Sequence, residues 1–260
     1  MKLLVYGEVL FDIYPDIDYI GGAPFNFSAH TSREGIDSWL LTAVGKDDLG
    51  NQALEIIESH NVNTKFVLKN QKRTGMVTVT LDENKVPSYN VHTDTAYDNI
   101  ELNDELITEL SKEKFDCLYF GTLIQRNYVS ANSLKKLNNS LHFKDVFCDL
   151  NLRKDCYDSE SIKLCLEKAT ILKISDEEEP VMRELGLYSA DNRGLEGIAC
   201  AISEKYLNVR IIIITLGAKG AYAYDCINKV SYFCDPVECK GGFNRRRRRQ
   251  LRGGIPCGLC

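Results

Sequence analysis

Short apolar runs alternate with amphipathic stretches along most of this chain, and this alternation limits the folds open to it. Residues 211–214 are all isoleucine, as in a strand that helices cover on both faces. The longer stretches between such runs carry apolar residues at helical spacing, so the pattern predicts β-α units around a mostly parallel sheet. The predicted strands are 3–6, 38–43, 117–120, 146–149, 170–174 and 210–215, and the predicted helices are 24–34, 48–59, 130–138, 159–168, 177–185 and 195–206.

Two stretches depart from this rhythm. Residues at about 9–20 and 74–92 alternate apolar and polar side chains, which is typical of half-exposed antiparallel strands. We interpret them as a small β-lid that folds beside the main sheet. Residues 1–240 then form a single α/β domain, and residues 241–260 have a different composition.

Composition narrows the class of protein further. The chain has 260 residues, of which 44% are hydrophobic and 27% charged, as is usual for a soluble globular protein. The net charge is −5, although the only charged residues in 241–260 are arginines, so the preceding body is more acidic still. An acidic body argues against general nucleic-acid binding. No apolar run approaches the roughly 20 residues that span a bilayer, and the acidic N-terminus lacks a secretory leader, so we expect no membrane association and a cytoplasmic location.

The ten cysteines are scattered through the sequence. Without a secretory leader, buried free thiols are a better interpretation than a disulfide framework. The C-x-x-C pair Cys257–Cys260 has no second pair of ligands nearby, so it does not predict a metal site.

The most suggestive local motif is Gly21-Gly22-Ala23-Pro24-Phe25-Asn26, directly before a predicted helix. Paired glycines allow a close backbone approach to a ligand, and proline suits the first helical turn. Asn26 would present a donor and an acceptor at the helix start, although a plain tight turn explains the same residues. Asp12 could accept hydrogen bonds from hydroxyl groups, but a lone aspartate at this kind of position is more often a turn or cap residue.

Four further motifs follow predicted strands, where open α/β sheets bind ligands. In 44–50, Asp47 or Asp48 suits a helix N-cap. Polar groups follow the strand in 148–153, and the acidic group 175–178 could start a helix or organise a hydrated magnesium ion. The small-residue turn at 215–220 includes Lys219 and could hold phosphates, although such turns are common. These sequences are Val-Gly-Lys-Asp-Asp-Leu-Gly, Cys-Asp-Leu-Asn-Leu-Arg, Ser-Asp-Glu-Glu and Thr-Leu-Gly-Ala-Lys-Gly.

Taken in order, these motifs resemble those of the ribokinase-like (PfkB) carbohydrate kinases, and within them the bacterial fructokinase branch. The resemblance covers residues 1–240 and also includes the opening Val5–Asp12, Thr95-Ala96-Tyr97-Asp98 and Phe120-Gly121-Thr122-Leu123. It implies a three-layer α/β/α fold with a mainly parallel central sheet and a small β-lid. The implied activity is ATP-dependent phosphorylation of a sugar hydroxyl, with fructose as the sugar and Mg²⁺ bridging the phosphates.

The resemblance also implies a division of labour among the residues. Sugar binding falls to Asp12, Gly21, Gly22, Asn26 and Asn151, and Arg153 supports phosphate transfer. The nucleotide turn comprises Thr215, Gly217, Lys219 and Gly220, and Glu178 holds the metal through water. Ser175 stands where the family more often has asparagine. Family members are expected to form homodimers through the lid.

The family's next motif, a Gly-Ala-Gly-Asp loop that opens a helix, is absent from residues 241–260. Its backbone N–H groups would hold the transferring phosphate and its aspartate would be the general base. We therefore expect this chain to be inactive, or to persist as a non-catalytic sugar-binding remnant. Loss of the helices that follow this loop in the family would also expose apolar surface and lower solubility.

A frameshift explains the substitution. One extra base after the Lys240 codon would be corrected by reading bases two and three of each codon with base one of the next. With suitable synonymous codons, residues 241–260 then yield V-V-S-T-V-G-A-G-D-S-F-G-A-A-F-L-A-G-F, which contains the missing motif in register. The alternative is a genuine arginine-rich arm, Arg245 to Arg249, that binds RNA or an acidic partner.

Overall fold

The computed structural model describes residues 1–15, 17–81, 87–189 and 194–236 of the chain. The chain forms two compact units, Met1–Leu172 and Lys173–Cys260. Residues 241–260, for which a frameshift or an arginine-rich arm is predicted, lie outside the described residues, as does the pair Cys257–Cys260.

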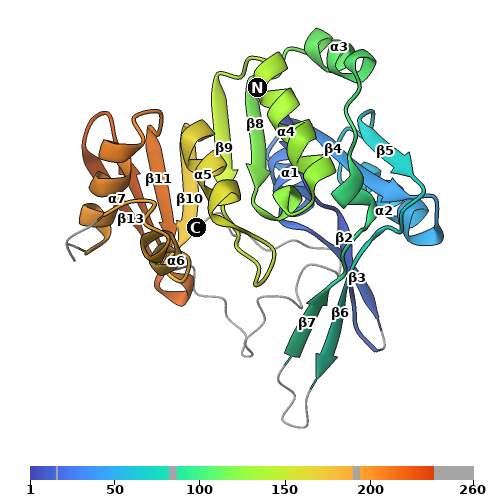
Figure 1. Ribbon diagram of the computed structural model, residues 1–260, viewed down its shortest axis with the longest axis horizontal. Helices are drawn as coiled ribbons and strands as arrows, with labels where there is room; N and C mark the ends of the chain where they lie inside the picture. Colours follow the sequence, from blue (N-terminus) through green and yellow to red (C-terminus); the bar gives the residue numbers. More distant parts are fainter. Residues whose placement is uncertain (16, 82–86, 190–193, 237–260) are drawn as a thin grey trace. The chain divides into compact units, whose positions relative to one another are not determined.

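The first unit contains a parallel sheet with the strand order β9-β8-β1-β4-β5 (Figure 1). Because every pair in this series is parallel, the carboxyl ends of the strands lie along one edge, where polar side chains from successive loops can meet. The strands are β1 (Lys2–Tyr6), β4 (Asp37–Gly45), β5 (Val67–Asn70), β8 (Cys117–Gly121) and β9 (Asp145–Asp149).

Helices cover both faces of this sheet. Alternate side chains of β1 point to opposite faces, so their contacts show which helices cover each face. Leu3 and Val5 belong to one buried cluster with apolar residues of α1 and α2, including Phe25 and Ile57. On the other face, the Tyr6 hydroxyl donates a hydrogen bond to the backbone of α4. The helical elements of the unit are α1 (Ala23–Arg33), α2 (Asp48–Ser59), η1 (Ala96–Asn99), α3 (Asp104–Lys112), η2 (Leu123–Gln125), α4 (Tyr128–Ser140) and α5 (Ser159–Lys168).

A second, smaller sheet is built from the two stretches with alternating polarity. Its strand order is β3-β2-β6-β7, from β2 (Leu10–Ile13), β3 (Asp18–Gly21), β6 (Gly75–Leu81) and β7 (Pro87–Val91). Each stretch forms an antiparallel pair, as predicted, but β2 and β6 join the two pairs in parallel, with Phe11 opposite Met76. The local sequence predicts each antiparallel pair, but it does not predict that β2 and β6 pair with each other in parallel.

The second unit has the strand order β13-β12-β11-β10, with the antiparallel pairs β11–β12 and β12–β13. Helix α7 contacts β12, and the thiol of Cys200 on α7 donates to the Tyr224 hydroxyl. The elements are β10 (Ile171–Ser175), α6 (Glu179–Glu184), α7 (Gly194–Lys205), β11 (Ile211–Thr215), η3 (Gly217–Lys219), β12 (Ala221–Asp225) and β13 (Val230–Cys234).

Within the described part of the chain, the two faces of the strand at 211–214 are buried to different extents. Ile212 and Ile214 are buried, whereas Ile211 is 39% exposed on the opposite face of β11. Tyr224 pairs with Ile212, so the face that α7 covers is the one carrying these buried residues.

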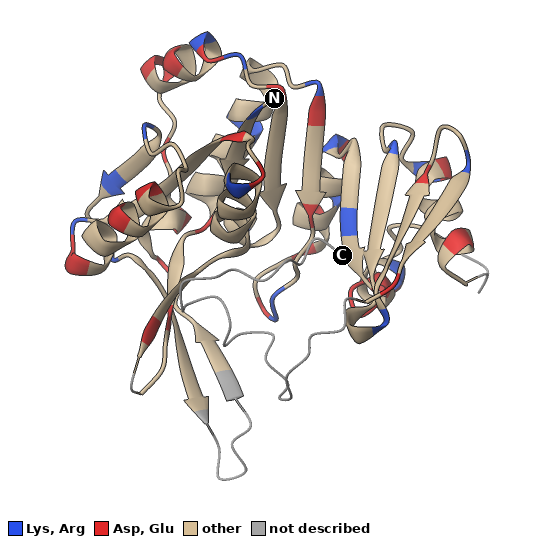
Figure 2. Cartoon of the chain, turned by 180° about the vertical axis from the view of Figure 1, so that it is seen from behind, with Lys and Arg blue, Asp and Glu red and all other residues tan. Residues whose placement is uncertain are grey.

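The predicted fold class is confirmed: the chain is a three-layer α/β fold with a large, mostly parallel sheet and a smaller, mostly antiparallel one (Figure 1). Most predicted boundaries lie within one or two residues of the observed ones. Charged side chains are spread over the helices and loops, as Figure 2 shows for α2 and α3. None of the helices in the described part of the chain has the length and apolar character needed to cross a membrane.

Candidate functional site

The start of α1 brings together several of the predicted sugar-binding residues. Gly22 is the N-cap of α1, with φ of 103°, and a Cβ there would overlap the carbonyl oxygen of Glu8. The close backbone approach that the paired glycines permit is thus to Glu8 of the same chain. Pro24 occupies the first helical turn as predicted. The backbone N–H of Asn26 donates to the Gly22 carbonyl at 3.0 Å.

Asp12 lies on β2, diagonally across from Gly21, the last residue of β3. One of its carboxylate oxygens is 3.5 Å from the position that a Cβ on Gly21 would occupy. Asp12 is opposite Tyr19 on one side and Val77 on the other, and it is half-buried. The small sheet therefore carries a carboxylate beside the glycine pair that leads into α1.

Glu8 was not predicted as a site residue, yet it lies at the centre of this region. It follows β1, is only 3% exposed, and accepts a hydrogen bond from the Ala23 amide at 3.2 Å. Burial raises the pKa of Glu8 to about 7; its own amide, the Ala23 amide and the charge of Arg153 oppose this rise, and Asp149 adds to it. An acid directly after an apolar strand is the only local signal that could have identified it.

The loop after β9 contributes the remaining predicted residues of this unit. The Tyr119 hydroxyl donates to the buried Asp149 carboxylate at 3.2 Å, at the carboxyl end of β9. Asn151 has a left-handed backbone, with φ of 44°, and is half-buried, as is Arg153. The charge of Arg153 lies close enough to Glu8 to lower its pKa, so the loop after β9 is near the start of α1.

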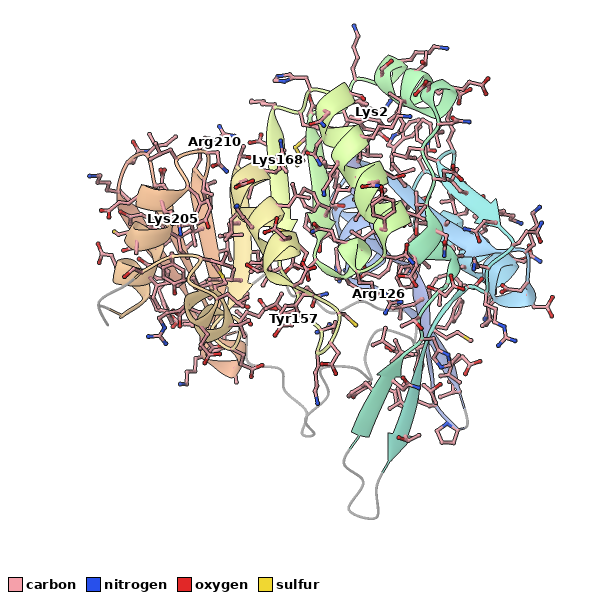
Figure 3. The ribbon with its side chains drawn as sticks, viewed as in Figure 1. Lys2, Arg126, Tyr157, Lys168, Lys205 and Arg210 are labelled. Carbon is pink, nitrogen blue, oxygen red and sulfur yellow. The ribbon has the colours of Figure 1, made fainter. Side chains whose placement is uncertain are left out.

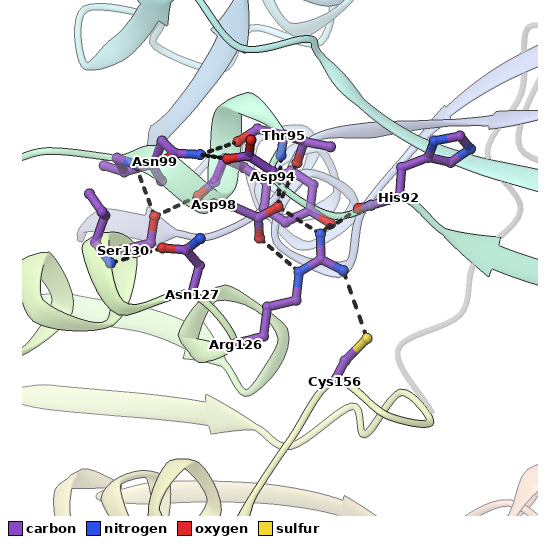
Figure 4. Close-up of polar contacts among 12 residues, drawn as sticks. His92, Asp94, Thr95, Asp98, Asn99, Arg126, Asn127, Ser130 and Cys156 are labelled. Carbon is purple, nitrogen blue, oxygen red and sulfur yellow. Dashed lines mark hydrogen bonds and ion pairs between the residues drawn. The ribbon is translucent and has the colours of Figure 1, made fainter.

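A second polar cluster, centred on Arg126, was also missed (Figure 4). The Arg126 guanidinium forms a buried ion pair with Asp98, and the exposed fractions of the two side chains are 8% and 1%. It also donates to the His92 carbonyl at 2.6 Å and to the Tyr97 hydroxyl at 2.7 Å. A weaker contact reaches the Cys156 sulfur at 3.7 Å. Arg126 therefore connects the chain leaving β7 with the loop after β9, at the base of the small sheet (Figure 3).

The motif at 44–50 has a structural role. Asp47 is the N-cap of α2 and accepts from the Gly50 amide at 2.8 Å, as the simple helix-cap interpretation predicts. It also accepts from the Thr74 amide and hydroxyl at 2.9 and 2.5 Å, and the Thr74 hydroxyl in turn accepts from the Gly45 amide. Asp47 thus holds the chain where it enters β6, as Arg126 holds it where it leaves β7.

In the second unit, the predicted nucleotide turn surrounds η3. Within the turn, the Leu216 amide donates to the Gly220 carbonyl at 2.9 Å, and Gly217 and Gly220 have positive φ values of 62° and 101°. A Cβ on Gly220 would overlap the Cys234 carbonyl, so packing within the chain is enough to explain a glycine at this position. The Thr215 hydroxyl donates to the Ile174 carbonyl at 3.3 Å.

Lys219 completes the turn, and its side chain is exposed to solvent. The predicted nucleotide residues therefore lie together in one short segment: Thr215 ends β11, and Gly217, Lys219 and Gly220 form the turn that follows.

Glu178, the predicted metal residue, is the N-cap of α6. One of its carboxylate oxygens accepts from the Ser175 amide at 2.8 Å, so the acidic motif starts a helix as well as presenting a carboxylate. Among the described residues, no three histidine, cysteine or acidic side chains gather as metal ligands.

Comparison with known proteins agrees with this architecture. The family model described as "pfkB family carbohydrate kinase" matches residues 18–240. A sugar kinase of Pyrococcus horikoshii is 30% identical over 89% of this chain and 70% of its own length. Its crystal structure in complex with ATP superposes with a TM-score of 0.72, at 24% identity over 91% of this chain and 78% of that one.

Fructokinases are also similar. The fructokinase of Salmonella typhimurium is 23% identical over 85% of this chain and 73% of its own length. The structure of Vibrio cholerae fructokinase, bound to fructose, ADP and a calcium ion, superposes with a TM-score of 0.70. Its identity is 21%, over 91% of this chain and 77% of that one.

Proposed function

The chain belongs to the PfkB family of carbohydrate kinases, which are ATP-dependent sugar phosphotransferases, and we propose that fructose is the sugar that its site recognises. The observation that carries the proposal is the carboxylate of Asp12 beside Gly21, at the junction of the small sheet and α1. A carboxylate accepts strong hydrogen bonds from hydroxyl groups. The similarity to several fructokinases supports fructose in particular.

Within this proposal, the first unit binds the sugar. Asp12 and Asn26 hydrogen-bond to its hydroxyls, Gly21 and Gly22 keep the backbone close to it, and Asn151 borders it from the loop after β9. The location of the glycine pair, Asp12 and Asn26 around the start of α1 supports the assignment. Arg153 would bind a phosphoryl oxygen, because a guanidinium suits the geometry of phosphate.

The second unit binds the nucleotide. The turn Thr215–Gly220 would accept the phosphates of ATP, with Lys219 as the exposed cation, and Glu178 would hold Mg²⁺ through water. Mg²⁺ supplies charge neutralisation of the transferring phosphoryl group when it is bound. The turn's backbone geometry and the Glu178–Ser175 contact support these roles.

We further propose that the 260-residue chain binds sugar but has little turnover. Residues 241–260 lack the Gly-Ala-Gly-Asp sequence whose aspartate serves as general base in the family. Sequencing the nucleotides around the Lys240 codon tests the frameshift behind this proposal. Arginine codons that cannot yield Gly-Ala-Gly-Asp in the shifted frame would refute it.

The same resemblance supports a homodimer formed through the small sheet. Strands β3 and β7 are at the two edges of that sheet as the structure describes it, and edge strands are ready to pair. Light scattering coupled to size-exclusion chromatography gives the mass directly, and a monomeric mass at micromolar concentration would contradict the dimer.

Calorimetric titration of the 260-residue chain with D-fructose tests the sugar site. Asp12→Asn is expected to weaken binding by about 10- to 100-fold, since it removes a charged hydrogen-bond acceptor. Asp18→Asn is the matched control, because Asp18 is exposed on the neighbouring strand. Equal effects of the two substitutions, or no binding of fructose by the parent chain, would contradict the assignment.

A further inference from the structure

Glu8 holds the first turn of α1 to the end of β1. Its carboxylate accepts from the Ala23 amide, and its carbonyl oxygen occupies the space where a Gly22 side chain would be. Gly7 and Pro24 are equally close, because a Cβ on Gly7 would overlap the proline ring. The position of α1, and with it that of Asn26, therefore depends on what surrounds Glu8.

Glu8 is also surrounded by charged and titratable groups from other elements. Arg153 and Asp149, from the end of β9 and its loop, act on its carboxylate with opposite signs. Tyr97 on η1 and Tyr119 on β8 are close enough for the charge of Glu8 to raise their pKa values, although burial is the main reason that these values are high. With the Ala23 amide, these are the groups of the described chain whose interaction with Glu8 carries the argument.

We propose that Glu8 is a positioning residue of the sugar site, which in its ionised form fixes the first turn of α1 and draws the Arg153 guanidinium toward it. The proposal rests on the proposed function, because α1 and the loop after β9 carry Asn26, Asn151 and Arg153. An ionised carboxylate accepts a stronger hydrogen bond from an N–H group than a protonated one does, and only the ionised form attracts a guanidinium.

A change of protonation at Glu8 therefore reaches the site in two ways, through the hydrogen bond from the Ala23 amide and through the charge of Arg153. Burial raises the pKa of Glu8 to about 7, so the change occurs near neutral pH. We expect the affinity for fructose to rise with pH through this value. Weakening of about tenfold at pH 6 relative to pH 8 corresponds to the loss of one charge-assisted hydrogen bond.

The test uses the full 260-residue chain without sugar first. NMR spectra recorded from pH 5 to 9 follow the backbone amide of Ala23 and the Nε–H of Arg153. Both signals are expected to move with one common midpoint, and Glu8→Gln should abolish both movements. Glu8→Asp keeps the charge on a shorter side chain and should retain a titration with altered amplitude. Movements that persist in Glu8→Gln would overturn the proposal.

Fructose titrations at pH 6 and pH 8 then complete the test. The parent chain should show the pH dependence, Glu8→Gln should bind at the weaker level at both pH values, and Glu113→Gln should behave as the parent. Glu113 pairs with Lys2 at the start of β1, away from the end that Glu8 follows. Equal affinities at both pH values in the parent would overturn the coupling. Intact NMR titrations without fructose binding would instead refute fructose as the ligand and leave the contacts of Glu8 established.

Discussion

Arg126 and Asp98 form a two-pronged ion pair, with Nε–Oδ1 and Nη2–Oδ2 distances of 2.7 and 2.8 Å, in a nearly solvent-free position. Arg126 is the residue that follows η2 and Asp98 lies in η1, and the pair fixes the point at which the chain leaves the small sheet. Since Arg126 also binds the His92 carbonyl, the pair joins the small sheet to the body of the first unit.

Breaking this pair should strongly destabilise the fold. Arg126→Met leaves the Asp98 carboxylate buried without its partner, which costs about 3–5 kcal/mol of unfolding free energy. Urea denaturation followed by circular dichroism measures the effect. Lys72→Met is the control, because it removes one partner of the exposed Lys72–Asp94 pair and should leave the midpoint nearly unchanged. Similar midpoint shifts for the two variants would contradict the special role of Arg126.

Gly22 should tolerate no side chain. Gly22→Ala combines an unfavourable φ of 103° with overlap against the Glu8 carbonyl, and we expect a loss of about 2–4 kcal/mol in unfolding free energy. Gly35→Ala is a matched control, because its φ is 82° but nothing lies within 4 Å of the added Cβ. The difference between the two variants in thermal or urea unfolding isolates the overlap; equal losses would show that backbone strain alone matters.

Glu8 should make stability depend on pH. Its ordinary pKa is 4.5 and burial raises it to about 7, so the folded chain binds more protons than the unfolded chain between these values. The contribution of Glu8 is therefore most favourable below pH 4.5, falls as pH rises, and has lost about 3 kcal/mol above pH 7.

The check is the difference in unfolding free energy between the parent chain and Glu8→Gln across pH 4.5–8. The glutamine side chain does not titrate, so this difference should follow the loss at Glu8. A difference that stays constant across this range would show that Glu8 does not titrate there in the folded state.

Restoring the reading frame should restore catalysis. The 260-residue chain is expected to release ADP in the presence of fructose and ATP at least about 10²–10⁴-fold more slowly than a frame-corrected chain, because it lacks the general base. A coupled assay for ADP gives both rates. Replacing the restored aspartate by asparagine is the control, and it should bring the corrected chain most of the way back to the low rate.

The second unit should limit solubility. Tyr232 on β13 is 62% exposed, and through Ala223 it shares a sheet face with Ile213 and the partly exposed Ile211. Exposed apolar patches on sheets promote association. Tyr232→Lys should raise the soluble fraction after expression, whereas Ser231→Lys adds the same charge on the opposite face and should help less. Equal gains would assign the effect to net charge.

Much of this architecture could be predicted from local patterns, and the rest depends on contacts between distant segments. Strands such as β4 and helices such as α2 follow from apolar periodicity and from the Asp47 cap. Helix α3 also has a local signal, since Asn103 caps it and acidic residues follow, but that signal was missed. The hairpin β12–β13 has a weaker signal in the sequence. Strand β13 is exposed on both faces, so apolar and polar residues need not alternate along it.

The residues of the candidate site also fall into two groups, those with a local sequence motif and those brought together only by folding. The Gly21–Gly22 pair and the turn at 215–220 are visible as motifs, whereas Arg126 has no local signal because His92, Asp98 and Cys156 become its neighbours only in the folded chain. Gly22 and Gly220 also show how one motif can have two explanations. Each glycine makes room for a carbonyl oxygen of the same chain, so its presence alone does not identify a ligand.

The parallel pairing of β2 with β6 also constrains the order of folding. These strands are separated in sequence by β3, α1, β4, α2 and β5, so their register can form only after the intervening chain has brought them together. Pairings between distant segments form slowly, since loop closure must precede them. The small sheet should therefore be among the last parts of the first unit to form, and a nascent or partly folded chain would present Asp12 without the neighbouring residues of the proposed sugar site.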